Sequence, residues 1–162
     1  RLEALTPPGH TARIDLTIVM SEEDAEYARQ CRDLANALPD RHSVRFLPGM
    51  AHEEIEGILG ASHIFALPTR GENFGHAIYE ALAAGRPVMV SDQTPWRGLE
   101  AHKAGWDLAI GDYAAFREKL DEVAAMDHDT LLAWCRGAWV MAEARQLESR
   151  SRLRETYLEQ FS

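Results

Sequence analysis

Cysteine is scarce in this chain, which has only Cys31 and Cys135 among its 162 residues. The two lie far apart and form neither a CxxC pair nor the dense pattern of a disulfide scaffold. Disulfides persist in oxidising compartments, whereas the cytoplasm keeps thiols reduced. We therefore expect a cytoplasmic protein.

Basic residues and long apolar runs are also few. Seventeen Lys and Arg against 26 Asp and Glu give a formal net charge of -9, which argues against nonspecific binding of nucleic acid. No apolar run approaches the ~20 residues of a membrane span, and no signal peptide is visible. An anionic ligand must then be held by local groups, because the overall field repels it.

Several catalytic and metal-binding motifs are absent. The chain has no GxSxG, no GxxxxGK[ST] and no GxGxxG, which disfavours hydrolases, P-loop enzymes and dehydrogenases. "HEEIE" (52–56) resembles the HExxH zinc motif, but Glu56 stands where the second histidine is needed. The other histidines show no ligand spacing, so we expect no metal site.

Apolar runs rich in β-formers alternate with helical patterns along the chain. Continuously apolar strands spaced by helices predict an α/β fold, with a Rossmann-like parallel sheet covered by helices on both faces. The expected strands span 14–20, 43–49, 63–68, 87–92 and 106–110. The expected helices span 21–38, 51–62, 74–84 and 113–126, with two more over about 129–160, and Ser21 and Asp112 as N-caps.

The segment 63–92 has the length of one βαβ unit. In such folds ligands bind beyond the carboxyl ends of the strands, where the stretch "TRGENFGHAIYEALAAGRP" (69–87) begins. The helical part of this stretch predicts an apolar stripe facing the sheet. Its members are Phe74, Ala77, Ile78, Ala81 and Leu82.

Glu72, His76 and Glu80 are spaced by four and follow one flank of this helix. The backbone amides of residues 73–76 have no partner within the helix and lie at the positive end of its dipole, which suits phosphate. A carboxylate on either side can accept hydrogen bonds from sugar hydroxyls. The alternative is that Glu72 is a first-turn dipole partner and Glu80 a solvated residue of the helix face.

The longer stretch "LPTRGENFGHAIYEALAAGRPVMVSD" closely resembles the signature of the retaining GT-B glycosyltransferases of the group 1, or family 4, type. The resemblance continues over the neighbouring segments, from about residue 14 to the end of the chain. The matching positions are Leu67, Pro68, Glu72, Phe74, Gly75, Glu80, Ala81, Ala84, Gly85, Pro87 and Val88.

The resemblance implies the nucleotide-sugar donor-binding domain of such an enzyme, acting with retention and without an obligatory metal or other cofactor. By position, Glu72 would be catalytic and contact the donor sugar, and Glu80 would contact the ribose. The remaining donor-binding residues implied are Gly49 and Met50 beside the nucleobase, and Asn73, Phe74, Gly75 and His76 beside the sugar or diphosphate.

The resemblance also implies parts that residues 1–162 do not contain. The family's acceptor-binding domain, and the strand followed by its basic pair for the diphosphate, would precede Arg1. We therefore expect a single-domain fragment that binds a nucleotide diphosphate sugar weakly and transfers nothing alone. His76 replaces the family's usual Leu or Ile, and either touches the donor or pairs with Glu80. Trp96 either borders the donor or anchors packing, and packing is favoured.

The sequence thus predicts a glycosyltransferase domain serving bacterial surface polysaccharide synthesis, with a glycan or lipid-linked acceptor. The intact enzyme would bind no nucleic acid and could associate peripherally with a membrane. Two alternatives stay open: a GT-B-fold nucleotide-sugar epimerase or phosphorylase, and a nucleotide-sugar-binding module without activity.

Overall fold

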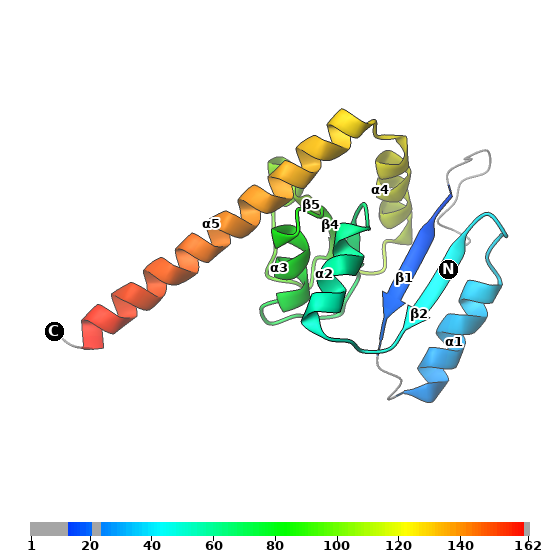
Figure 1. Cartoon of the computed structure of the whole chain (residues 1–162), viewed down its shortest axis with the longest axis horizontal. Helices are drawn as coiled ribbons and strands as arrows, with labels where there is room; N and C mark the ends of the chain where they lie inside the picture. Colours follow the sequence, from blue (N-terminus) through cyan, green and yellow to red (C-terminus); the bar gives the residue numbers. More distant parts are fainter. Residues whose placement is uncertain (1–12, 21–23, 161–162) are drawn as a thin grey trace. The chain divides into compact units, whose positions relative to one another are not determined.

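The computed structural model describes residues 13–20 and 24–160, with side chains described up to Ser151. The chain divides into two compact units, and Figure 1 labels their helices and strands. The first comprises Arg1–Ile55 and Gly111–Ala125, and the second comprises Glu56–Ile110 and Met126–Ser162.

The first unit contains a parallel pair of strands. Its elements are β1 (Asp15–Val19), α1 (Ala25–Asn36), β2 (Ser43–Leu47) and α4 (Tyr113–Ala125). Strand β1 pairs in parallel with β2. The Asp24 carboxylate caps α1 by accepting from the Tyr27 amide at 2.9 Å, while the expected cap, Ser21, lies outside the described residues. Asp112 caps α4 as predicted, accepting from the Ala115 amide at 3.0 Å.

The second unit holds a three-stranded parallel sheet in the order β3-β4-β5. Helix α2 (His52–Gly60) begins in the first unit and ends in this one. The other elements are β3 (Phe65–Leu67), α3 (His76–Ala83), β4 (Val88–Ser91), the 3-10 turn η2 (Glu100–His102), β5 (Gly105–Leu108) and α5 (His128–Gln160).

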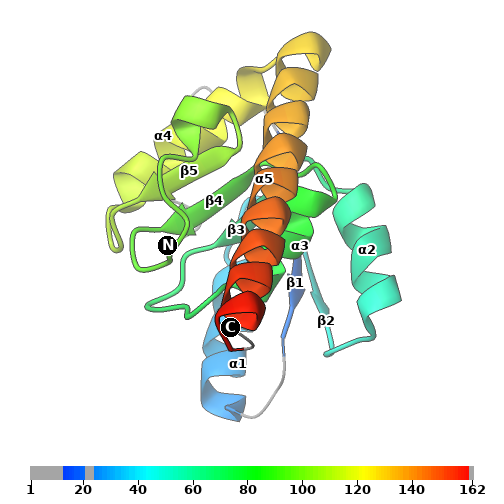
Figure 2. The ribbon, with the colours of Figure 1, turned by 90° about the vertical axis from the view of Figure 1, so that its left-hand side faces the viewer.

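Strand β4 is the centre of this unit, and all four of its residues are buried. Helix α3 packs on β3 and β4, and α5 lies along α3 (Figure 2). Trp106 on β5 stacks on Trp134 of α5 with ring centroids 4.3 Å apart. Gly105 has φ 146°, and a Cβ there would lie 1.9 Å from the Val88 carbonyl oxygen, so only glycine fits.

The predicted fold class is confirmed, since the chain is α/β with parallel strands flanked by helices. Two expectations about helices were wrong. The region 129–160 forms one continuous helix, α5, because it contains no proline and its one glycine, Gly137, packs closely against η2. Helix α3 begins at His76, two residues later than expected, because Gly75 before it forms a left-handed turn. That residues 1–162 form a single domain stays a prediction.

Candidate functional site

The loop between β3 and α3 is held in place by the segment that follows β4. The buried Ser91 hydroxyl donates to the Thr69 carbonyl oxygen, and the Glu72 amide donates to the Gln93 carbonyl oxygen at 3.3 Å. Since β3 and β4 are parallel neighbours, both segments leave the sheet at the same edge. The loop is therefore tied to its neighbour at two separate points.

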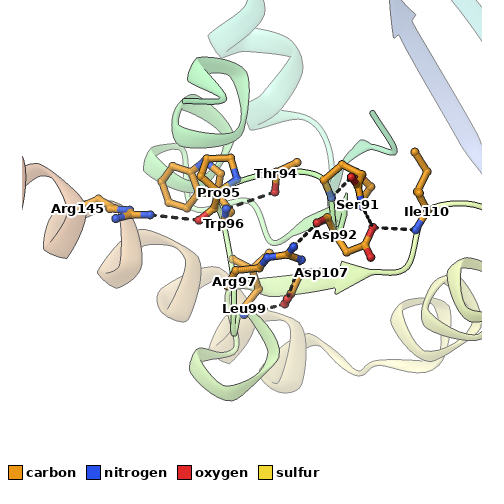
Figure 3. Close-up of polar contacts among 11 residues, drawn as sticks. Ser91, Asp92, Thr94, Pro95, Trp96, Arg97, Leu99, Asp107, Ile110 and Arg145 are labelled. Atoms are coloured by element: carbon orange, nitrogen blue, oxygen red, sulfur yellow. Dashed lines mark hydrogen bonds and ion pairs between the residues drawn. The ribbon is translucent and has the colours of Figure 1, made fainter. Parts of the chain in front are cut away.

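A third tie comes from Trp96, whose indole N–H donates to the Phe74 carbonyl oxygen at 2.8 Å. Trp96 is only 2% exposed, so the donor side of this bond is shielded from water. Arg145 of α5 places its guanidinium 5.1 Å from the centre of the Trp96 ring and donates to the Pro95 carbonyl oxygen at 3.4 Å (Figure 3). Trp96 is thus a packing anchor, as the sequence favoured.

Gly75 precedes the first residue of α3 in the left-handed conformation, with φ 74° and ψ 59°. A Cβ at this position would lie 2.9 Å from Ile78 Cδ1 and 3.1 Å from Trp96 Nε1. Its carbonyl oxygen accepts from the amides of Ile78 and Tyr79, each at 3.0 Å. This turn makes His76 the first helical residue.

Phe74 was expected on the buried stripe of the helix, and that expectation was wrong. Its side chain is 46% exposed and lies over neighbouring rings, with centroids 4.8 Å from His76 and 6.4 Å from Tyr79. The physical reason is the turn at Gly75, which places Phe74 before the helix. Of the expected stripe, Ile78, Ala81 and Leu82 are buried, while Ala77 is exposed.

The backbone amides of residues 73–76 donate to no hydrogen-bond acceptor within the described part of the chain. They lie at the amino end of α3, where the helix dipole is positive. The loop ties fix the backbone that carries these amides, so the donors are positioned before any ligand arrives. Such a group of fixed amides can bind an anion such as a phosphate.

The remaining predicted site residues fall in two places. Glu72 is exposed in the loop, His76 is exposed at the start of α3, and Glu80 is half-buried one turn later. Gly49 and Met50 follow β2 in the first compact unit. The roles expected for all the predicted site residues stay predictions.

A polar network extends along the same edge of the sheet beyond β4 and β5 (Figure 3). Asp92 accepts from the Ile110 amide at 3.0 Å, and Arg97 donates to the Asp92 carbonyl oxygen. Arg97 also lies 3.8 Å from Asp107, whose carboxylate accepts from the Leu99 amide at 3.2 Å. The hydrogen bond from the Gln93 side chain, aided by the Ile110 amide and the charge of Arg97, lowers the pKa of Asp92.

Two nearby cations are excluded as phosphate ligands of this loop by their position. Arg86 follows α3 and donates to the Ser62 carbonyl oxygen, before β3 begins, at 2.9 Å. Lys103 ends η2, just before β5. In a parallel sheet, Arg86 and Lys103 therefore lie at the edge where the strands begin, whereas the loop lies at the edge where they end.

Among the described residues, no cluster of three or more His, Cys, Asp or Glu side chains could hold a metal ion. Nor does any helix within those residues have the length and apolar character needed to cross a membrane.

The sequence profile described as "Glycosyl transferases group 1" matches residues 11–132. The chain belongs to this glycosyltransferase family. The match covers parts of both compact units and the whole loop from Thr69 to Gly75. The fixed amides and the two carboxylates therefore lie within a glycosyltransferase domain.

Curated relatives of this glycosyltransferase domain have named activities. It is 34% identical over 118 residues to a D-inositol 3-phosphate glycosyltransferase of Gordonia bronchialis, covering 68% of the chain and 24% of the relative. It is 30% identical over 111 residues to a GDP-mannose:cellobiosyl-diphosphopolyprenol alpha-mannosyltransferase of Komagataeibacter xylinus, covering 67% of the chain and 28% of the relative. The chain thus spans about a quarter of the length of these proteins.

Solved structures show the same fold. A sucrose-phosphate synthase from Thermosynechococcus elongatus superposes with a TM-score of 0.67 at 18% identity, covering 92% of this chain and 46% of that one. WaaG, a glycosyltransferase involved in lipopolysaccharide biosynthesis, gives a TM-score of 0.59 at 17% identity, covering 81% of this chain and 42% of that one. The glycosyltransferase domain therefore has the architecture of GT-B glycosyltransferases.

Proposed function

We propose that this chain is the donor-binding domain of a retaining, metal-independent glycosyltransferase that uses a nucleotide diphosphate sugar. The observation that carries the proposal is the loop before α3. It contains Glu72 and the fixed amides of residues 73–76, and Glu80 follows one turn into α3. Amides suit the diphosphate, and carboxylates suit the hydroxyl groups of the sugar and the ribose.

The relatives support a sugar transferred to a small phosphorylated polyol or to a lipid-linked glycan. One relative is named for D-inositol 3-phosphate, and another for GDP-mannose and a cellobiosyl-diphosphopolyprenol. We infer the second class for this protein, because its segment "SDQTPWRGLEAHKAGWDLAI" (91–110) resembles the corresponding segment of bacterial surface-polysaccharide enzymes. The intact enzyme would then work in the cytoplasm, in peripheral contact with the membrane that holds its acceptor.

The two carboxylates are expected to act differently in an intact enzyme that contains this domain. Glu80→Gln should raise KM for the donor with little change in kcat, because ribose contacts change little during transfer. Glu72→Gln should lower kcat more than it raises KM, since positive charge develops on the sugar in the transition state. Steady-state kinetics with GDP-mannose and UDP-glucose measures both effects. Normal kcat and KM in both variants would contradict the assignment.

Product analysis separates this function from its alternatives. NMR of the anomeric proton in the product should show the same configuration as in the donor. A changed donor sugar released without an acceptor would indicate an epimerase, and a sugar 1-phosphate would indicate a phosphorylase. Binding without any product would indicate a nucleotide-sugar-binding module.

A further inference from the structure

Among the described side chains of helix α5, up to Ser151, four large apolar ones are exposed. Leu132 is 39% exposed, Trp139 52%, Val140 57% and Leu147 62%. The opposite side of the helix is buried in its own unit through Trp134, Ala138 and Ala142. A single exposed apolar residue is ordinary, whereas several on one face indicate a contact surface.

Four exposed charged residues share this face. At 3.6 residues per turn, all eight positions fall within about 100° of the helix circumference. They follow steps of three and four along much of their length, the spacing of a coiled-coil seam. The α5 stripe, as we name this face, consists of Asp129, Leu132, Arg136, Trp139, Val140, Glu143, Leu147 and Arg150.

The α5 stripe is complementary to itself when it is read in the opposite direction. A two-fold axis placed between Trp139 and Val140 brings each position against a suitable partner. Charged positions meet opposite charges, and apolar positions meet apolar ones. The pairs are Asp129 with Arg150, Leu132 with Leu147, Arg136 with Glu143, and Trp139 with Val140.

We propose that two copies of this chain associate through the α5 stripe as an antiparallel pair of helices. A two-fold contact requires one surface that complements itself, and the α5 stripe meets that condition. From Asp129 to Arg150 the contact would extend for about 32 Å at 1.5 Å per residue. The proposal does not depend on the donor site.

Charge also selects the direction of the pair. A parallel pair would set Arg136 against Arg136 and Glu143 against Glu143 of the second copy, and like charges facing each other are destabilising. The antiparallel pair replaces both repulsions with attractions. A lipid surface fits less well, because membrane-binding helices have a polar face rich in Lys and Arg, whereas the charges here alternate in sign.

Charge exchange tests the pairing in solution. Sedimentation equilibrium over a range of concentrations should show a dimer of the 162-residue chain. Arg136→Glu alone and Glu143→Arg alone should each raise the dimer dissociation constant by about tenfold, because each places two like-charge contacts in the dimer. The double variant Arg136→Glu/Glu143→Arg should restore wild-type association, since it only exchanges the two partners.

Glu118→Arg is the matched control for Glu143→Arg, because it makes the same charge change at an exposed position of α4. It should leave the dissociation constant unchanged, and circular dichroism should show equal helicity in all variants. A chain that is monomeric at every concentration overturns the proposal. A dimer whose dissociation constant does not change in the two charge-reversal variants also overturns it.

Disulfide cross-linking tests the direction independently. Leu132→Cys and Leu147→Cys are prepared as separate chains in which Cys31 and Cys135 are replaced by serine. The antiparallel pair predicts that a mixture forms the mixed disulfide under mild oxidation, while either chain alone forms little. Efficient cross-linking of each chain with itself, or no cross-linking in the mixture, contradicts the antiparallel pair.

Discussion

Gly75 sets the conformation of the turn that leads into α3. Its φ of 74° is unfavourable for other residues, and a side chain would approach Ile78 and Trp96 within 2.9 and 3.1 Å. Glycine therefore allows the indole of Trp96 to reach the Phe74 carbonyl. The position of the free amides depends on this one residue.

Gly75→Ala should lower the free energy of unfolding by about 1–3 kcal/mol, since it combines backbone strain with a steric contact. Urea denaturation followed by circular dichroism measures the change. Gly71→Ala in the same loop is the control, because no atom lies within 4 Å of a Cβ there. Equal stability of the two variants would show that the turn is not constrained as described.

The sequence predicted a residue's structural role correctly where its residue type has one strong structural preference. The apolar spacing of Ile78, Ala81 and Leu82 identified the buried side of α3, and Asp112 was recognised as a cap. Phe74 was misplaced because periodicity does not show where a helix begins. The parts played by Ser91 and Arg145 were missed, since they depend on contacts between segments far apart in sequence.

At the scale of elements, the close contact between α5 and η2 depends on a glycine inside a helix. A Cβ at Gly137 would lie 2.3 Å from the His102 carbonyl oxygen and 2.5 Å from that of Lys103. Helix interiors usually disfavour glycine by about 1 kcal/mol. The close packing explains why α5 contains one.

Gly137→Ala should therefore destabilise the protein by about 1–3 kcal/mol despite the better helix propensity of alanine. Gly57 in α2 provides the contrast, because nothing lies within 4 Å of a Cβ there. Gly57→Ala should stabilise the protein by up to about 1 kcal/mol. Thermal unfolding of both variants measures the difference, and a stabilising Gly137→Ala would refute the close contact.

The Asp92 carboxylate, after β4, accepts a hydrogen bond from the Ile110 amide, after β5. The stability that this bond contributes should depend on pH. The pKa of Asp92 lies below the ordinary value of 3.8 because its charged form accepts hydrogen bonds from the Gln93 side chain and the Ile110 amide. A lowered folded-state pKa contributes stability that is present above pH 3.8 and lost as the pH falls through the folded-state pKa.

Asp92→Asn should consequently be less stable than the wild type at neutral pH, and this difference should shrink as the pH falls below 3.8. Urea denaturation of both proteins at several pH values measures the difference, in which other carboxyl groups cancel. A stability difference that stays constant with pH would show that the charge of Asp92 is not involved.

At the scale of the whole molecule, the order of strands and helices could be predicted because each element has its own period of apolar residues. The pairing of the strands could not be predicted, because it depends on contacts between elements far apart in the sequence. The described strands form a two-stranded and a three-stranded sheet. The predicted division of residues 129–160 into two helices was wrong, because the local apolar pattern does not show whether one helix continues through the region.

The part of the candidate site that lies within the family signature, residues 67–92, could be predicted from the sequence. That segment contains Glu72, Glu80 and the amides between them, and the structure adds the ties that fix the loop. A site formed by distant segments is harder to predict. Gly49 and Met50 lie in the other compact unit, so their part in a nucleobase site rests on the resemblance alone.

A backbone-amide NMR titration of this chain with GDP-mannose and UDP-glucose examines whether the loop before α3 binds a nucleotide diphosphate sugar. We predict weak, saturable binding by at least one of the two, with the largest shifts at the amides of residues 73–76. Glu80→Gln should weaken that binding, while Glu118→Arg should not alter it. Shifts that avoid residues 73–76 at saturation, or no binding of either compound, would contradict the donor-site assignment.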